Sequence, residues 1–357
     1  MKVILSGYYG FHNTGDEAIL YSLIQQLRAH DASIDITVLS NDVTHTRNTY
    51  QVQAVNRWNV KEVIQAIKQS DGLITGGGSL LQDVTGIKSI IYYTGVMRIA
   101  KFLRRPVFVY SQGMGPITGR IAKKLTKVTL NKVDYLTVRD EESKQLLTEI
   151  GVKKEITVVP DSVMGLDYSP TTSSYTQNNN SIIMVSVRDW PSQQPYKEKI
   201  AHALDRLVRP GGYQIVFIPM HGENDAQCSE DIRSLMEESA EVLPHHLSIQ
   251  EKIDTIANSK LLIGMRLHSL IFSAISTTPF IAISYDPKID AFANLLDQNV
   301  LVHVNDEFWQ EEEIIQEVSR LNKERTHVQN HLKGIIWKKK SESNQAVKEI
   351  ISMIENL

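Results

Sequence analysis

Short runs of β-branched and aliphatic residues alternate with longer stretches of helical periodicity through the first part of the chain. This alternation is typical of a doubly wound parallel sheet, in which helices connect buried strands. We therefore predict a Rossmann-like α/β domain over residues 1–168. Its predicted strands are Val3–Leu5, Ile36–Leu39, Leu73–Thr75, Val107–Tyr110, Tyr135–Val138 and Ile156–Val159.

The same alternation restarts after a polar stretch without periodicity. Residues 169–181 are rich in Thr, Ser and Asn, a composition typical of an interdomain linker. We predict a second Rossmann-like domain over residues 182–340, followed by a C-terminal helix over 341–357 that docks on one of the domains. The apolar runs of the second domain are Ile182–Val187, Gln214–Ile218, Leu261–Ile263 and Phe280–Ser284.

The composition agrees with two domains and argues against several classes of function. A chain of 357 residues exceeds what one hydrophobic core usually organises. A net charge of -3 argues against nucleic-acid binding, and the single Cys228 cannot build a disulfide framework or a cysteine-rich metal site. The chain starts without a signal h-region, and no run approaches the ~18 apolar residues of a membrane span. We expect a cytoplasmic protein that touches a membrane only at its inner face.

A cation and an imidazole follow the apolar run Leu261–Ile263. Arg266 and His268 stand at a strand-to-helix junction, and such junctions line the ligand crevice of open α/β sheets. Arginine binds phosphate or carboxylate with a permanently charged fork, and histidine exchanges a proton near neutral pH. The alternative is structural, with Arg266 covering a helix end and His268 satisfied in the core.

Further cations stand at other predicted strand ends. Arg139 follows the run Tyr135–Val138, and its alternative fate is a salt bridge to the acidic residues beside it. Lys288 either reaches the crevice or is solvated. His221 either binds a substrate hydroxyl or caps a turn. No histidine pair has helical metal-ligand spacing and no Asp-x-Asp motif occurs, so we predict no metal and no resident cofactor.

Glycine-rich loops follow three strands of the first domain. The loop after the first strand carries Asn13, Asp16 and Glu17, with Asp16 or Thr14 expected to cap the next helix. Its glycine spacing matches neither the dinucleotide fingerprint nor a P-loop. The other two loops offer candidates that approach a ligand or serve helix packing and turns, namely Gly77, Gly78 and Gln112.

Together these segments resemble the polysaccharide pyruvyltransferase family, particularly its members that act on bacterial secondary cell-wall polysaccharide. The resemblance implies a two-lobed GT-B-like fold. It also implies that phosphoenolpyruvate, a co-substrate, donates a pyruvyl group to a lipid-linked saccharide. The product is a 4,6-ketal on N-acetylmannosamine, and phosphate is released. The segments are Gly7–Ile19, Gly76–Asp83, Ser111–Pro116, Val138–Glu142, Pro160–Ser162 and Gly264–Ser269.

The resemblance places Arg139, His268 and Lys288 at family binding and catalytic positions. Since the donor carries two anionic groups, we assign Arg139, Arg266 and Lys288 to its phosphate and carboxylate, with the pairing left open. His268 is the expected general acid and base. The acceptor-side candidates, among which Asp16 or Glu17 would be the base for a sugar hydroxyl, are Asn13, Asp16, Glu17, Gly77, Gly78 and Gln112.

Two other functions fit parts of this pattern. A GT-B glycosyltransferase that uses a nucleotide sugar would share the two lobes, because fold does not decide function. A non-catalytic carbohydrate-binding protein would share them too, but would not need an imidazole beside several cations. The lipid-linked acceptor implies peripheral membrane contact, for which Lys338–Lys340 beside Trp337 is a candidate, with a solvated face as the alternative.

Overall fold

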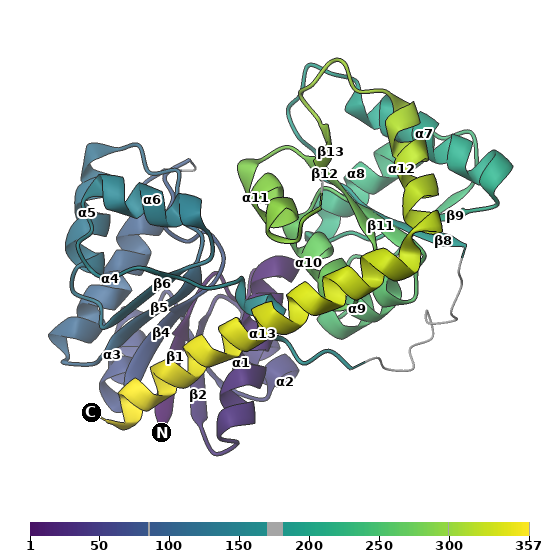
Figure 1. Ribbon diagram of the computed structural model, residues 1–357. Coiled ribbons are helices and arrows are strands. Elements are labelled where there is room, and N and C mark those ends of the chain that lie inside the picture. The colour runs from purple at the N-terminus through teal and green to yellow at the C-terminus, as the bar shows by residue number, and fades with distance from the viewer. Residues whose placement is uncertain (85, 170–180, 299, 357) are drawn as a thin grey trace. The chain divides into compact units, whose positions relative to one another are not determined.

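The computed structural model describes residues 1–84, 86–169, 181–298 and 300–356, and it contains two α/β parts, each built on a parallel sheet with helices around it (Figure 1). The chain divides into two compact units. The first consists of residues 1–167 and 338–357, and the second of residues 168–337. Most of the predicted linker, residues 170–180, lies outside the described residues.

The first unit is built on a seven-stranded parallel sheet in the order β3-β2-β1-β4-β5-β6-β7. The order reverses between β1 and β4, so the carboxyl ends of these strands form the switch point where open α/β sheets bind ligands. The strands are β1 (Lys2–Ser6), β2 (Asp35–Ser40), β3 (Gln53–Asn56), β4 (Gly72–Gly76), β5 (Val107–Gln112), β6 (Tyr135–Val138) and β7 (Thr157–Val158).

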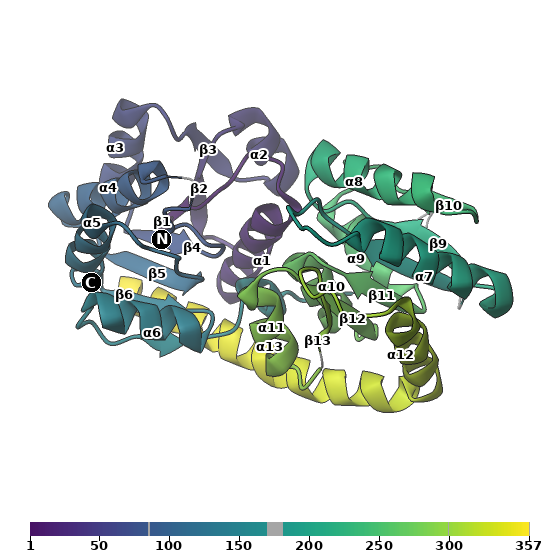
Figure 2. The ribbon, with the colours of Figure 1, turned by 90° about the horizontal axis from the view of Figure 1, so that it is seen from above.

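Helices cover both faces of this sheet (Figure 2). A core that includes Leu73, Met97 and Leu130 joins one face to α3, α4 and α5. On the other face, Tyr110 of β5 lies 2.7 Å from the Ser343 hydroxyl of the last helix. The helices are α1 (Thr14–His30), α2 (Val43–Tyr50), α3 (Val60–Gln69), α4 (Lys88–Phe102), α5 (Arg120–Leu130) and α6 (Glu141–Ile150), with a 3-10 turn at Ser162–Gly165.

The second unit repeats the plan with a six-stranded parallel sheet in the order β10-β9-β8-β11-β12-β13. Here the switch point lies between β8 and β11. The strands are β8 (Ile182–Ser186), β9 (Gln214–Phe217), β10 (Ala240–Val242), β11 (Leu261–Gly264), β12 (Phe280–Ser284) and β13 (Val300–His303). The helices are α7 (Tyr196–Gly211), α8 (Gly222–Leu235), α9 (Ile249–Ala257), α10 (Leu267–Ile275), α11 (Pro287–Leu295), α12 (Glu311–Lys323) and α13 (Arg325–Glu355).

The hydrophobic pattern located every central strand and missed three edge strands. β3, β10 and β13 are short and partly exposed. β3 and β10 lack the apolar run that marks a buried strand, whereas Val300-Leu301-Val302 of β13 is a short apolar run that the sequence analysis left unassigned. The helix expected at 341–357 is the end of the longer α13, which begins at Arg325. Among the described residues, no helix has the length and apolar character needed to cross a bilayer.

The residue that caps α1 differs from the two expected. Asn13, not Thr14 or Asp16, is the N-cap, and its side-chain oxygen accepts a hydrogen bond of 3.0 Å from the Gly15 amide. Asparagine suits this position because its short side chain reaches the free amides of the first turn. Asp16 is thereby left free of the capping role.

Candidate active site

The carboxyl edge of the first sheet holds Arg139 among acidic side chains. Arg139 follows β6 directly, and its side chain is only 9% exposed. Its guanidinium lies 3.4 Å from both Asp140 and Asp161, and its Nη2 donates to the Ser79 hydroxyl at 3.2 Å. A Cβ on Gly113 would come within 2.7 Å of this guanidinium, so glycine there makes room for it. The salt bridge that the sequence analysis gave as the alternative role of Arg139 is therefore present, with N–O distances of 3.4 Å.

Asp16 is the titratable group of this edge. Its pKa is raised to about 7, mainly by burial and also by the negative charges of Glu17 and Asp161, against the opposing charge of Arg139. A Cβ on Gly78, whose φ is +67°, would lie 2.7 Å from the Asp16 carboxylate. Glycine at position 78 thus leaves the carboxylate uncovered by a side chain. A carboxyl group with this pKa exchanges a proton readily at neutral pH.

The other acceptor-side candidates of this loop have structural partners. Glu17 is buried and accepts hydrogen bonds from the Gly10 amide at 2.8 Å and the Tyr50 hydroxyl at 2.6 Å. A Cβ on Gly77 would come within 2.2 Å of Ile19, so close packing on α1 explains that glycine. Together with the capping by Asn13, these contacts hold the loop in shape and leave Asp16 as its candidate for chemistry.

Gln112 ends β5 at the floor of the same edge. It is fully buried; its amide donates to the Thr75 carbonyl at 3.4 Å, while its side-chain oxygen has no hydrogen-bond partner among the described residues. The same holds for the hydroxyls of Ser6 and Thr75, at the ends of β1 and β4. Buried polar atoms without partners are costly, so they favour a site that a polar ligand or water completes.

An aromatic cluster that the sequence analysis did not single out surrounds Arg57 in the first unit. The Arg57 guanidinium is buried, and its carbon lies 4.2 to 5.4 Å from four ring centres. Two of its nitrogens donate to the Gly7 carbonyl and the Tyr93 hydroxyl. The four rings are Phe11, Trp58, Tyr92 and Tyr93.

Two aromatic side chains of this neighbourhood face solvent. Trp58 is 59% exposed and donates from its indole nitrogen to Asn41, and Tyr8 is 39% exposed and stacks on Phe11. Burial raises the pKa of Tyr8, the charge of Asp16 raises it further, and Arg57 opposes them. Asp16 and Arg57 therefore both lie within electrostatic reach of Tyr8, which connects the aromatic cluster to the titratable carboxyl group.

In the second unit Arg266 is held by a buried carboxylate. Its Nε donates to Asp225 Oδ2 at 2.8 Å, and Nη2 contacts the other carboxylate oxygen, so the pair is bidentate. Asp225 is 1% exposed and also accepts from the Met220 amide at 3.2 Å. This geometry fixes the guanidinium but offsets its charge. Arg266 therefore has a structural partner in Asp225, and its role toward a ligand stays a prediction.

His268 and Lys288 stand at the same edge on neighbouring helices. His268 lies, half-buried, in the first turn of α10, whose free amides favour a bound anion. Lys288 is in the first turn of α11; its ammonium lies 2.8 Å from Asp286 and 5.2 Å from the Tyr285 ring centre. Because Asp286 also caps α11, this lysine is tethered near the strand end rather than freely solvated.

Arg188 is the cation that the sequence analysis missed. It follows β8 at the switch point, donates to the Tyr285 hydroxyl at 2.9 Å and lies over the Tyr285 and Trp190 rings. No carboxylate of the described residues forms an ion pair with it. The available signal was a repeated triplet, since Val187-Arg188-Asp189 matches Val138-Arg139-Asp140, and each follows a strand.

His221 lies close to this group of cations. Burial lowers its pKa, and the positive charges of Arg266 and Arg188 lower it further, against the opposing charge of Asp225. At neutral pH the imidazole is therefore predominantly uncharged and can donate or accept a hydrogen bond. In the described part of the chain, no group of three or more His, Cys, Asp or Glu side chains is arranged to hold a metal ion.

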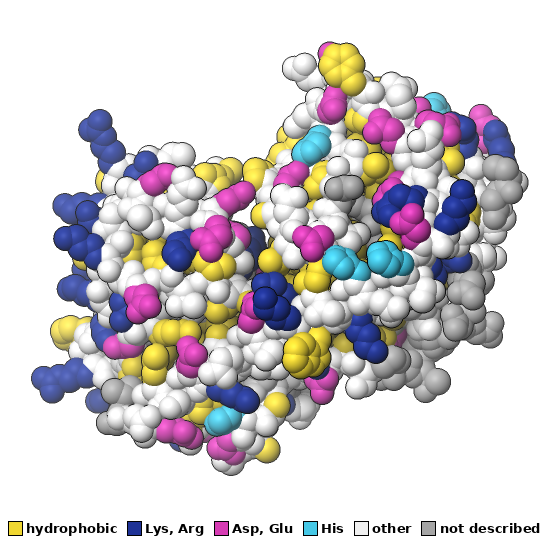
Figure 3. Space-filling model, in the orientation of Figure 1, with side chains coloured by type: hydrophobic (Ala, Val, Ile, Leu, Met, Phe, Trp, Pro, Cys, Tyr) yellow, Lys and Arg dark blue, Asp and Glu magenta, His cyan; other side chains and the backbone are white. Residues whose placement is uncertain are grey.

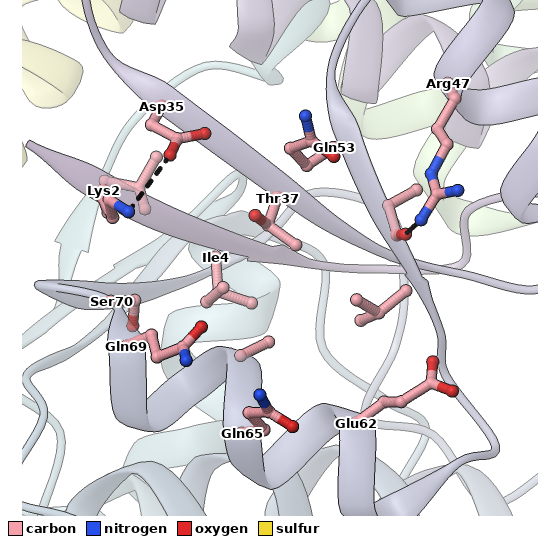
Figure 4. A pocket seen from close by; sticks show the side chains of 14 residues that line it. Lys2, Ile4, Asp35, Thr37, Arg47, Gln53, Glu62, Gln65, Gln69 and Ser70 are labelled. Atoms are coloured by element: carbon pink, nitrogen blue, oxygen red, sulfur yellow. Dashed lines mark hydrogen bonds and ion pairs between the residues drawn. The ribbon is translucent and has the colours of Figure 1, made fainter.

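A hollow elsewhere in the first unit does not include any of these residues. It has a volume of about 380 Å³ and is lined by the first residues of β1 and β2, by β3 and by α3 (Figure 4). Lys2 and Asp35 lie 3.6 Å apart at one end, and Arg47 donates to the Ala54 carbonyl. The charges of Lys2 and Asp35 offset each other, and the hollow holds none of the candidate site residues.

Comparison with solved structures shows the fold. Over its whole length the chain is similar to the UDP-GlcNAc 2-epimerase of Neisseria meningitidis bound to UDP-GlcNAc, with 12% identity, full coverage of both chains and a TM-score of 0.62. It is equally similar to Anabaena HepE in complex with UDP, with 12% identity, full coverage and a TM-score of 0.64. Such neighbours are GT-B glycosyltransferases and epimerases, which confirms the predicted architecture.

Comparison of amino-acid sequences identifies the family, which comparison of folds does not. The chain is 22% identical to the amylovoran biosynthesis protein AmsJ of Erwinia amylovora, with 90% of this chain and 95% of that protein covered. The family model for polysaccharide pyruvyl transferase matches residues 13–287, from the cap of α1 to the start of α11. The match includes Asp16, Arg139, Arg188, Arg266 and His268; it begins after the end of β1 and ends at the residue before Lys288. The chain therefore belongs to the polysaccharide pyruvyl transferase family and is a transferase of polysaccharide biosynthesis.

Proposed function

We propose that this protein transfers the pyruvyl group of phosphoenolpyruvate to a saccharide, closing a 4,6-ketal on an N-acetylmannosamine residue of a lipid-linked cell-wall polysaccharide precursor. The observation that carries the proposal is the cluster of cations at the switch point of the second sheet. Arg188, Arg266 and Lys288 gather there with His268. A compact dianion matches such a cluster better than a neutral ligand does.

We assign the cations to the anionic groups of the donor according to whether a carboxylate already pairs with each of them. Arg188 has no carboxylate partner among the described residues, and is the strongest candidate for the phosphate or carboxylate fork. Arg266 and Lys288 are oriented by Asp225 and Asp286, and each retains further N–H donors for an anion. Arg139 keeps the donor assignment that the family resemblance gives it.

The reaction requires proton transfers that His268 would perform. The first sugar hydroxyl adds to C2 while the C2–C3 π pair takes a proton at C3. The second hydroxyl then replaces phosphate at C2, and phosphate leaves with the electron pair of the C2–O bond. Of the two hydroxyl protons, one is balanced by the proton gained at C3 and the other by phosphate. His268, in the first turn of α10, would deliver the proton to C3.

The first unit would serve the acceptor. Asp16, with a pKa near 7, would take the proton of the attacking hydroxyl. The exposed rings of Trp58 and Tyr8 would stack on a sugar ring, because pyranose rings present apolar C–H faces to aromatic surfaces. The unpartnered oxygen of Gln112 would accept a hydrogen bond from a sugar hydroxyl directly or through water.

One incubation tests the proposal against its rival. Purified protein is mixed with an N-acetylmannosamine-containing acceptor and either phosphoenolpyruvate or UDP-sugars, and products are identified by mass spectrometry and phosphate release. We expect acceptor-dependent phosphate release and a product heavier by one pyruvate less water. Glycosyl transfer from a UDP-sugar, with phosphoenolpyruvate unconsumed, would contradict the proposal and favour a nucleotide-sugar glycosyltransferase.

A further inference from the structure

The outer surface of α4 and α5 carries an unusual charge distribution. Residues 84–133 contain no Asp or Glu, although the chain as a whole has more acidic than basic residues. The segment holds ten basic residues, namely Lys88, Arg98, Lys101, Arg104, Arg105, Arg120, Lys123, Lys124, Lys127 and Lys132. α4 and α5 pack side by side, so many of these cations share one surface, which we call the α4–α5 face.

The charge of this face is not offset within the unit. Among the described residues, Lys101 is the one of these ten cations with an ion pair, at 2.8 Å from Asp134. The dark-blue side chains in Figure 3 gather along the side of the first unit that α4 and α5 form in Figure 1. Unpaired cations concentrated on one surface attract a polyanion or an anionic surface.

Exposed apolar side chains stand among these cations. Phe102, at the end of α4, is 86% exposed, and on α5 Ile121 and Val128 are 68% and 43% exposed. A groove of about 540 Å³ runs between the two helices, with Phe102 and Val128 in its lining and Arg98, Lys101 and Lys132 at its rim. Isolated exposed apolar residues are ordinary, but here they share a surface with the cations.

We propose that the α4–α5 face binds the surface of an anionic phospholipid bilayer. Its lysines and arginines would meet the headgroups, while Phe102, Ile121 and Val128 enter the interface. The combination selects this partner, because a nucleic acid would match the cations but would not need aliphatic side chains. Vesicle binding requires no turnover, so this inference stands or falls independently of the proposed reaction.

The alternative basic site, Lys338–Lys340 beside Trp337, is less suited to this task. Lys340 pairs with Asp167 at 2.6 Å and Lys339 pairs with Glu342 at 2.9 Å, so only Lys338 of the three lacks an ion pair among the described residues. Neutralised lysines have little to offer an anionic surface. The ion pairs of Lys339 and Lys340 agree with a solvated face for this segment, and we place the proposed membrane contact on the α4–α5 face.

Cosedimentation with vesicles tests the proposal. Wild-type protein is mixed with vesicles of phosphatidylglycerol and phosphatidylcholine in equal parts, or of phosphatidylcholine alone. We expect binding to the anionic vesicles only. The triple variant Lys123→Glu, Lys124→Glu, Lys127→Glu should bind on the order of a hundredfold more weakly, because three headgroup contacts are lost and reversed. Phe102→Ser should weaken binding about tenfold through lost apolar burial.

Matched variants on α13 provide the control. Lys333→Glu, Lys338→Glu, Lys348→Glu changes the net charge equally, and Trp337→Ser removes an equally exposed ring. Both should bind vesicles as the wild type does, and melting curves verify that all variants fold. Equal losses from the α13 variants, no binding of wild type to anionic vesicles, tighter binding to an oligonucleotide, or a dimer that only the α5 variant dissociates would each overturn the proposal.

Discussion

The carboxyl edges of the two parallel sheets carry opposite balances of charge. At the edge of the first, Arg139 lies among Asp16, Asp140 and Asp161, while Arg57 is enclosed by aromatic rings. At the edge of the second stand three cations, Arg188, Arg266 and Lys288. Asp225 pairs with Arg266 and Asp286 pairs with Lys288, whereas no carboxylate of the described residues forms an ion pair with Arg188. An acidic edge is suited to removing a proton from a hydroxyl group, whereas a cationic edge is suited to holding an anion.

The repeated Val-Arg-Asp triplet shows how tertiary surroundings divide the same residues between tasks. Arg139 lies within 3.4 Å of two carboxylates. Arg188 instead lies against the faces of Tyr285 and Trp190 and donates to a phenol. A guanidinium among aromatic rings keeps its full positive charge for a ligand, because the rings supply only a weak attraction. The following predictions test this division.

The largest expected effect concerns the imidazole of the cationic edge. His268→Ala should lower kcat about a thousandfold with little change in the KM for phosphoenolpyruvate, because a general acid acts mainly in the transition state. Steady-state kinetics on a soluble acceptor measures both constants. The control His202→Ala removes an exposed histidine of α7. Undiminished turnover in His268→Ala would remove the imidazole from the chemistry.

The next prediction compares Arg188, which forms no ion pair with a carboxylate of the described residues, with cations that lie beside carboxylates. Arg188→Ala should raise the KM for phosphoenolpyruvate about a hundredfold, because a charge-assisted fork to an anion is lost. Lys288→Ala and Arg139→Ala should each raise it by about tenfold, since their charges are partly offset by nearby carboxylates. Arg233→Ala, on the surface of α8, is the control. A donor titration that Arg188→Ala leaves unchanged would reject the assignment.

The next prediction concerns how kcat and stability depend on pH through Asp16 of the acidic edge. If Asp16 is the base, wild-type kcat should rise as pH increases through about 7, and Asp16→Asn should lose that limb and most activity. Because burial raises its pKa, the folded state holds a proton that the unfolded state releases, so stability falls as pH rises from about 4 to 7.

Thermal unfolding of Asp16→Asn checks the same group without substrate. The variant should be more stable than wild type at pH 8, by on the order of 2 kcal/mol, and nearly equal to it at pH 4. Asp35→Asn, an exposed carboxylate at the start of β2, serves as the control. Parallel pH profiles for the wild type and Asp16→Asn would show that another group titrates.

The smallest effect concerns the aromatic cluster beside the acidic edge. Trp58→Ala should raise the KM for the saccharide about tenfold while leaving the KM for phosphoenolpyruvate unchanged, because one stacking face is lost. Phe308→Ala, which removes an even more exposed ring in the second unit, should change neither constant. If Trp58→Ala instead raised the KM for phosphoenolpyruvate, the ring would belong to the donor site and not to the acceptor site.

The sequence by itself determined the two α/β units, the central strands and most of the charged residues at the strand ends. It could do so because buried parallel strands are continuous apolar runs, and because their carboxyl ends must meet at one edge. It missed the edge strands β3 and β10, which are partly exposed and carry no such run, and it left the short apolar run of β13 unassigned.

Tertiary structure alone decided which partners each candidate site residue has. Asn13, Glu17 and Gly77 read as ligand candidates in the sequence, yet their contacts with the Gly15 amide, Tyr50 and Ile19 give them structural tasks. Arg188 acquired its importance from Tyr285, which lies 97 positions away in the chain. The charge of a side chain follows from its residue type. Whether a neighbouring charge offsets it depends on contacts within a few ångströms, which form only in the folded protein.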